Sequence, residues 1–179
     1  MSLLAYSELL QLADEGVITP CNYKDVNASS IDVHLGRYVI IESCAHSHPV
    51  DISKRESFSS IKVDLKDRPC VLGPGEFALA QTIETFNLPL DISAEFRLKS
   101  SGARSGLNNL FACHCDAGWN GSVLTLELHN VLRYHALVLT YGMPIGQMLF
   151  HRHTPVPEKD SYAARGRYNG DKETHGVKP

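Results

Sequence analysis

The stretch Val123-Leu-Thr-Leu-Glu-Leu-His129 carries the pattern on which the fold prediction rests. Successive side chains of an extended chain point to opposite sides, so its leucines share one face. The other face carries Val123, Thr125, Glu127 and His129. The pattern predicts a strand with its leucine face in a core and its opposite face wetted. From this pattern alone, a surface role for the Glu127 carboxylate is slightly favoured over a catalytic one.

Further apolar runs of strand length indicate a mainly β protein. A helix is predicted over Tyr6–Glu15, ending before Gly16, and the alternation from Ile31 to Leu35 predicts an early strand. The remaining predicted strands are Tyr38–Ile41, Phe77–Gln81, Ile92–Leu98, Leu110–Cys113, Val123–Leu128, Ala136–Thr140 and Gln147–His151. Turn sequences such as Gly73-Pro-Gly75 separate them. The spacing favours a compact β-barrel or jelly roll with one short N-terminal helix.

Length and composition favour a single domain over residues 1–179, because 43% of the chain is hydrophobic, enough for a substantial core. No apolar run approaches the ~20 residues that span a bilayer. The start of the chain lacks a charged segment and a cleavage site. Five cysteines without a secretory signal indicate free thiols in a reducing compartment, so we expect a cytoplasmic protein without a membrane partner.

The formal net charge of −3 excludes the broad basic surface on which most nucleic-acid binding depends. Phosphate recognition would then have to come from a local cluster of charges. A mononucleotide partner is therefore favoured over a nucleic-acid polymer.

One such cluster is Lys99-Ser-Ser-Gly-Ala-Arg104, in a predicted Gly/Ser-rich turn. A guanidinium can hold phosphate oxygens with two parallel hydrogen bonds, and the hydroxyls of Ser100 and Ser101 can fill further acceptor sites. The missing side chain of Gly102 lets a phosphate approach the backbone. The alternative is an ordinary polar turn after the preceding strand.

The segment Cys113-His114-Cys115 contains potential zinc ligands in a row. Alternation along a strand would leave at most Cys113 and Cys115 on one side, so a metal site is disfavoured. The zinc deaminases need His-x-Glu followed by Pro-Cys-x-x-Cys, and neither pattern occurs in the sequence. We expect no zinc.

Beyond Thr154 the apolar content falls, yet the tail contains Tyr162, Arg165, Arg167 and Tyr168. Aromatic and guanidinium groups on a mobile terminus would suit a lid over an anionic ligand. A solvated tail is an equal alternative on composition alone.

Read in order, the motifs resemble the dCTP deaminase branch of the dUTPase-like superfamily. The segments that carry the resemblance are Ser29-Ser-Ile-Asp-Val-His-Leu-Gly36, Leu72-Gly-Pro-Gly-Glu-Phe-Ala-Leu-Ala80, Leu88-Pro-Leu-Asp-Ile-Ser93, Lys99-Ser-Ser101, Asp116-Ala-Gly-Trp-Asn-Gly121, Leu124-Thr-Leu-Glu-Leu128, Gly142-Met-Pro-Ile-Gly-Gln147 and the tail around Tyr162 and Tyr168. The resemblance implies a homotrimer of distorted β-barrels, with each active site built from neighbouring subunits. It also implies that residues 154–179 form a flexible lid.

The resemblance further implies deamination without zinc, with Glu127 as the general base and acid. Arg104, Ser100 and the backbone of Ala112 would position water, base and triphosphate, and Asp116 would hold the deoxyribose. The implied substrate-binding set is Lys99, Ser100, Ser101, Arg104, Asp116, Gln147, Tyr162, Arg167 and Tyr168. The implied substrate is dCTP, with Mg²⁺ bound through its triphosphate, and dUTP and the inhibitor dTTP are further candidate ligands.

The resemblance favours hydrolysis of dCTP to dUTP and ammonia. One alternative is a bifunctional enzyme that goes on to dUMP and pyrophosphate, because Asp116-Ala-Gly resembles the sequence of such members. An alternative of another class is a non-catalytic nucleotide-binding or scaffold barrel in which Glu127 is merely solvated.

Overall fold

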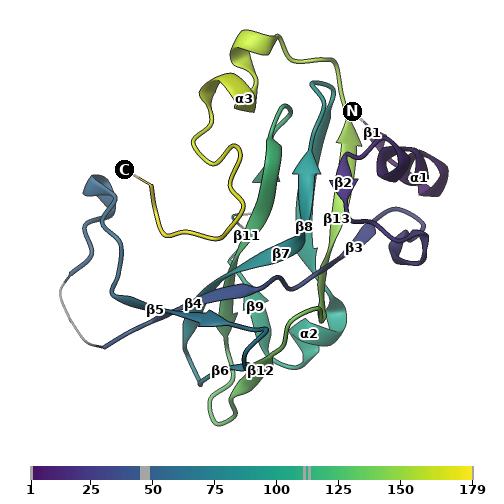
Figure 1. Ribbon diagram of the computed structural model, residues 1–179. Coiled ribbons are helices and arrows are strands. Elements are labelled where there is room, and N and C mark those ends of the chain that lie inside the picture. The colour runs from purple at the N-terminus through teal and green to yellow at the C-terminus, as the bar shows by residue number, and fades with distance from the viewer. Residues whose placement is uncertain (1, 45–48, 111, 113, 179) are drawn as a thin grey trace.

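The computed structural model describes residues 2–44, 49–110, 112 and 114–178, which form antiparallel β-sheets with short helices at their edges (Figure 1). The helices are α1 (Tyr6–Asp14), α2 (Ser100–Arg104) and α3 (Tyr162–Arg165), with 3₁₀ turns η1 (Tyr23–Asp25), η2 (Ile52–Lys54) and η3 (Glu158–Asp160). None of the helices in the described part of the chain has the length and apolar character needed to cross a bilayer.

The first sheet has the strand order β1 (Ser2–Leu3), β13 (Pro144–Arg152), β8 (Ile92–Leu98) and β10 (His114–Cys115), and β3 (Ile31–His34) also pairs with β13. The second has the order β5 (Ser60–Asp64), β4 (Tyr38–Glu42), β7 (Phe77–Asn87), β11 (Asn120–Asn130) and β9 (Leu107–Asn109), with β2 (Ile18–Thr19) also on β7. A two-stranded antiparallel sheet pairs β6 (Cys70–Leu72) with β12 (Leu137–Leu139).

The core lies between the sheets and is filled from alternate positions of their strands. Ile31, Leu126, Leu128 and Phe150 are fully buried there. Removing such apolar side chains from water is the main driving force for folding, at ~1.5–3 kcal/mol for each large side chain. The expected mainly β class, the N-terminal helix and the strand through Val123–Leu128 are confirmed.

The predicted strand Leu110–Cys113 is wrong. Leu110 and Ala112 lie outside any strand, and Phe111 and Cys113 lie outside the described residues. Before this segment β9 pairs with β11, and after it β10 pairs with β8 in the other sheet. The chain changes sheets here, so it has to leave one ladder before it joins the next.

The predicted turn at Lys99–Arg104 is also corrected, because Ser100–Arg104 is a short helix that follows directly on Lys99. The backbone N–H of Ala103 donates to the carbonyl oxygen of Lys99 at 3.1 Å, closing the first helical turn. The helix is followed by Gly106, whose φ of 91° favours glycine.

A buried carboxylate links β7 to β3. Glu84 is 3% exposed, accepts a hydrogen bond from the backbone N–H of His34 at 3.0 Å, and has its Oε1 2.8 Å from His34 Nδ1. Burial raises the pKa of the Glu84 carboxyl, and the bonds from His34 only partly oppose that effect. The folded state therefore favours the protonated form of Glu84 more than the unfolded state does.

This shift predicts a pH-dependent stability difference between the protein and its Glu84→Gln variant. The contribution of a group with a raised folded-state pKa is complete below the unfolded value, near 4.5, and is lost as pH rises through the folded value. The variant should therefore gain stability relative to the parent as the pH rises above about 4.5. Denaturant unfolding at fixed protein concentration measures this, with Glu95→Gln as a more exposed control. A difference that stays flat, or slopes the other way, would show that His34 keeps Glu84 ionised.

Candidate active site

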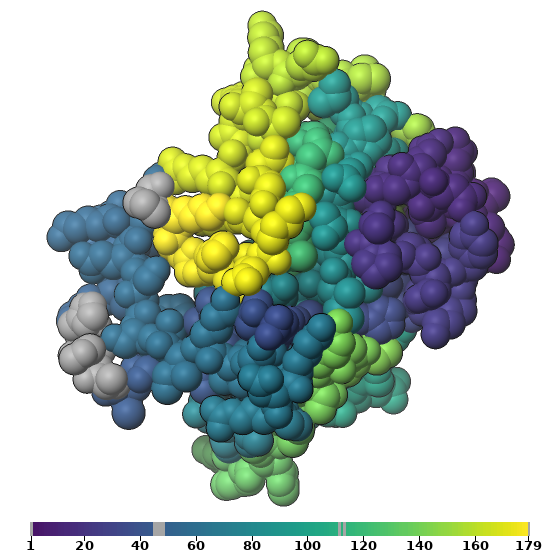
Figure 2. Space-filling view, in the orientation of Figure 1, coloured from purple at the N-terminus to yellow at the C-terminus, as the bar shows by residue number. Residues whose placement is uncertain are grey.

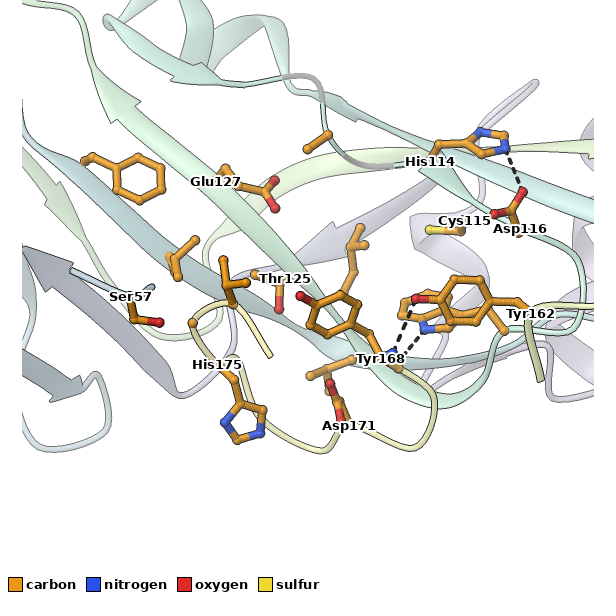
Figure 3. Close-up of a pocket in the computed structure, with 18 of the residues that line it drawn as sticks. Ser57, His114, Cys115, Asp116, Thr125, Glu127, Tyr162, Tyr168, Asp171 and His175 are labelled. Carbon is orange, nitrogen blue, oxygen red and sulfur yellow. Dashed lines mark hydrogen bonds and ion pairs between the residues drawn. The ribbon is translucent and has the colours of Figure 1, made fainter. Parts of the chain in front are cut away.

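A cavity of about 480 Å³ lies between the β7–β11 face, the segments 56–58 and 112–119, and the carboxyl-terminal tail (Figure 3). Ligand pockets in proteins commonly have volumes of ~300–1,000 Å³. The cavity is therefore large enough for a small organic molecule.

Strand β11 supplies the central polar groups of the cavity. Thr125 and Glu127 line it, while Leu126, between them, is fully buried in the core. On the neighbouring strand, Leu79 is directly opposite Glu127 and also lines the cavity. The half-buried carboxylate of Glu127 thus lies in a mixed polar and apolar cleft, and Figure 3 shows it on the same strand face as Thr125. The interpretation of Glu127 as a solvated surface group is not supported by this placement.

The segment before β11 forms a second wall. Ala112, His114 and Asp116 are exposed and line the cavity together with the buried Cys115. His114 Nε2 lies 3.3 Å from Asp116 Oδ1. The Asp116 side chain is 64% exposed, so its carboxylate can accept hydrogen bonds from a ligand or from water.

The carboxyl-terminal tail forms the third wall, with Tyr162 and Tyr168 facing the cavity. Trp119 Nε1 donates to the carbonyl oxygen of Tyr168 at 2.9 Å, and the Tyr168 N–H donates to Tyr162 Oη at 3.3 Å. Burial raises the pKa of the Tyr162 hydroxyl. Figure 2 shows the tail in yellow, seated on the surface between the blue and green parts of the chain.

The start of the tail packs closely because Gly118 has no side chain. Gly118 has a φ of 83°, and a Cβ there would lie 2.9 Å from Ser161 Cβ. Ser161 and Thr174 are both buried, so the alternative of a solvated tail is wrong. Arg167 is exposed and is not among the residues that line the cavity. The mobility expected of a lid stays a prediction.

Sequence reasoning missed several residues of the cavity. Asp171 and His175 line it from the tail, and Ser57 and Phe58 line it from a loop. The loop residues belong to no motif, and nothing in their sequence indicates that the tail would pack beside them. Only the prediction that the tail covers a ligand could have pointed to Asp171 and His175.

The predicted phosphate-binding residues lie elsewhere in the chain. Lys99, Ser100, Ser101 and Arg104 are not among the residues that line the cavity, and α2 lies at the end of the barrel away from the tail (Figure 1). Lys99 Nζ pairs with Asp32. Arg104 Nε donates to Ser100 Oγ at 3.3 Å.

Gln147 belongs to this second region and not to the cavity. It is opposite Asp32 in the pairing of β13 with β3, and its Oε1 accepts a hydrogen bond from Ser30 Oγ at 3.1 Å. Within one chain, therefore, the structure brings Glu127, Ala112 and Asp116 together with Tyr162 and Tyr168. It keeps Gln147 and the Lys99–Arg104 segment apart from them.

Of the Cys113-His114-Cys115 segment, the structure describes His114 and Cys115. Cys113 lies outside the described residues, and His114 and Cys115 differ in exposure, as alternation along a strand requires. Within the described ranges, no group of three or more His, Cys, Asp and Glu side chains is arranged to hold a metal ion.

Comparison with known proteins identifies the family. The model of the dCTP deaminase-like family matches residues 3–153. The dUMP-forming dCTP deaminase of Parafrankia sp. is 36% identical over 163 residues, which is 89% of this chain and 76% of that protein. The dUMP-forming dCTP deaminase of Methanosphaera stadtmanae is 35% identical over 167 residues, 89% of this chain and 83% of that protein.

A solved structure agrees with these relatives. The 2′-deoxycytidine 5′-triphosphate deaminase from Agrobacterium tumefaciens superposes with a TM-score of 0.65 at 25% identity, covering 83% of this chain. The match spans 48% of the length of that protein. The resemblance inferred from the motifs is confirmed, and the chain belongs to the dCTP deaminase-like family.

Proposed function

We propose that this protein hydrolyses dCTP in two steps, releasing first ammonia and then pyrophosphate, so that the product is dUMP. The observation that carries the proposal is that the half-buried Glu127 lines a cavity beside the carboxyl-terminal tail, in a chain of the dCTP deaminase-like family. The motifs alone favour dUTP as the product. The names of the relatives, dUMP-forming dCTP deaminases, support the bifunctional alternative instead.

In the first step, water adds to C4 of the cytosine ring. Glu127 accepts a proton from the water as the C–O bond forms, and passes it to N3 of the ring. The proton of the C4 hydroxyl then moves through Glu127 to the exocyclic nitrogen, the C4=O bond forms as the C–N bond breaks, and ammonia leaves, giving dUTP. A carboxylate in this role contributes ~10²–10⁴-fold to the rate. The aromatic tail over the cavity excludes bulk water, which strengthens the electrostatic interactions inside.

In the second step, another water attacks the α-phosphorus of dUTP and loses a proton to solvent. The bond from the α-phosphorus to the oxygen that bridges the α- and β-phosphates breaks, and pyrophosphate leaves with that oxygen, giving dUMP. Asp116 is an exposed carboxylate of the cavity wall, and it can orient this water or hold the deoxyribose hydroxyl. Mg²⁺ enters with the nucleotide, held by triphosphate oxygens, so Mg·dCTP is the substrate.

In this proposal, the triphosphate is bound by the Lys99–Arg104 segment of a second copy of the chain. Lys99, Ser100, Ser101 and Arg104 carry the donors that phosphate needs, yet they lie outside the cavity of their own chain. A homotrimer would bring this segment of one subunit to the cavity of the next. Exposed apolar side chains support such assembly, since Val71 and Val138 are opposite each other on β6 and β12 and are more than half exposed.

The cytoplasm is the proposed compartment. Cys21, Cys44 and Cys70 are free thiols, as expected of a protein in a reducing environment. Nucleotide triphosphates would be available to the enzyme there.

A product assay tests the reaction directly. Incubation of the protein with dCTP and Mg²⁺ should release ammonia, dUMP and pyrophosphate in equal amounts, measured by anion-exchange chromatography and an ammonia assay. Accumulation of dUTP with ammonia would restrict the activity to deamination. Absence of ammonia with retained dCTP binding would favour the non-catalytic nucleotide-binding barrel.

Mixing inactive variants tests whether two subunits share one site. The Glu127→Gln and Arg104→Ala proteins should each be inactive alone. Every site of the first lacks the carboxylate, and every site of the second lacks the guanidinium that binds the triphosphate. After dissociation and reassembly of an equal mixture, some sites combine a native Glu127 with a native Arg104 from the neighbour. Activity should return to about a quarter of the native value, as expected for random trimers with heterologous contacts. No recovery in trimers shown to be mixed would place both residues of a site in one chain.

A further inference from the structure

One residue of the tail is buried more completely than its neighbours. Thr174 is 1% exposed, although the residues on either side of it are half-buried or exposed. Its backbone N–H donates to Gln81 Oε1 at 3.0 Å, and its hydroxyl lies 3.2 Å from Thr125 Oγ1. Gln81 is itself only 5% exposed. Burying an amide side chain costs free energy unless it is hydrogen-bonded. The hydrogen bond from Thr174 therefore offsets the cost of burying Gln81 in the folded state.

The contact lies beside the proposed catalytic carboxylate. In the pairing of β7 with β11, Gln81 is opposite Thr125 and Leu79 is opposite Glu127. Thr125 and Glu127 are two positions apart on the same face of β11, which corresponds to about 7 Å along the strand. Figure 3 shows both side chains on this face, with the tail passing beside Thr125 towards His175.

The residues that follow Thr174 complete the cavity wall. His175, Gly176 and Val177 all line the cavity. Gly176 packs against Ser57, and a Cβ on Gly176 would lie 2.8 Å from Ser57 Oγ. The position of Thr174 therefore determines whether this part of the tail reaches across the opening.

The ion pair of the preceding residue is a weaker anchor. Lys62 Nζ lies 2.5 Å from Glu173 Oε2, but both side chains are more than 40% exposed. Exposed ion pairs contribute little because solvent screens them and ordering the long side chains costs entropy. The buried hydrogen bond to Gln81 restrains the tail more strongly than this ion pair, because breaking it leaves the buried N–H of Thr174 without an acceptor.

We propose that Gln81 is a positioning residue for the deamination, which holds residues 174–177 across the cavity next to Glu127. This inference rests on the proposed function. Gln81 touches no reacting atom. It acts through Thr174, so that the cavity over Glu127 is closed when nucleotide is bound and opens when the contact to Thr174 breaks.

The test compares Gln81→Leu with a control on the opposite face of the same strand. Gln81→Leu removes the acceptor and leaves the Thr174 N–H buried without a partner. Thr82→Val removes a buried hydroxyl that donates to the Glu84 carbonyl oxygen at 2.8 Å and accepts from the Leu124 N–H at 3.0 Å. Both variants weaken the barrel, but only Gln81→Leu affects the tail contact. Amide hydrogen exchange without nucleotide and steady-state kinetics with dCTP are the measurements.

In Gln81→Leu, exchange of the amides in residues 172–178 should accelerate on the order of tenfold to a hundredfold. KM for dCTP should rise by a similar factor, because substrate binding then has to order the tail. In Thr82→Val, the unfolding midpoint should fall while tail exchange and KM stay at native values. Thr174→Val keeps the N–H and loses only the hydroxyl, so its effect should be smaller than that of Gln81→Leu.

Unchanged tail exchange in Gln81→Leu, or faster exchange with an unchanged KM, would overturn the proposal. If Gln81→Leu does not fold, Thr174→Pro removes the same hydrogen bond from the tail side and gives the same readouts. If the native protein shows no turnover of dCTP, the proposed function fails and the positioning role fails with it. Faster amide exchange of the tail in Gln81→Leu would then show that Gln81 holds the tail in place but has no role in a reaction of dCTP.

Discussion

The antiparallel pairing of β7 with β11 determines where the polar groups of the cavity lie. Leu126 and Leu128 are fully buried in the core, so Thr125 and Glu127 have to point the other way. A slip of one residue would bury Glu127 and expose the leucines. Each buried leucine contributes ~1.5–3 kcal/mol, more than a typical net hydrogen bond, so apolar burial fixes the register and the register fixes the site.

The same ladder explains which parts of the fold could be predicted from the sequence. The alternation in β11 is visible because its core positions are all leucine. The sequence predicts β7 only as far as Gln81, because the polar residues Gln81, Thr82 and Glu84 end the apolar run. These polar residues are buried only because the tail, Leu124 and His34 supply their hydrogen-bond partners. Those partners are distant in sequence, so local periodicity does not reveal them.

The candidate site shows the same limit. Motifs identified Glu127, Asp116, Tyr162 and Tyr168, which the structure gathers around one cavity. They also predict an anion-binding segment at Lys99–Arg104, but these residues do not line the cavity of their own chain. The contribution of the loop residue Phe58 arises from packing against Phe77, at a ring separation of 5.8 Å, and no local pattern predicts such a contact.

The central claim is that the Glu127 carboxylate transfers the protons of the deamination. The most direct measurement is turnover and equilibrium binding of dCTP by the Glu127→Gln variant, which keeps the shape of the side chain but cannot accept the proton. The account predicts that turnover falls at least ~10²-fold, while the Kd for dCTP changes by only a few-fold. Native turnover in this variant would assign the proton transfer to another group and contradict the account.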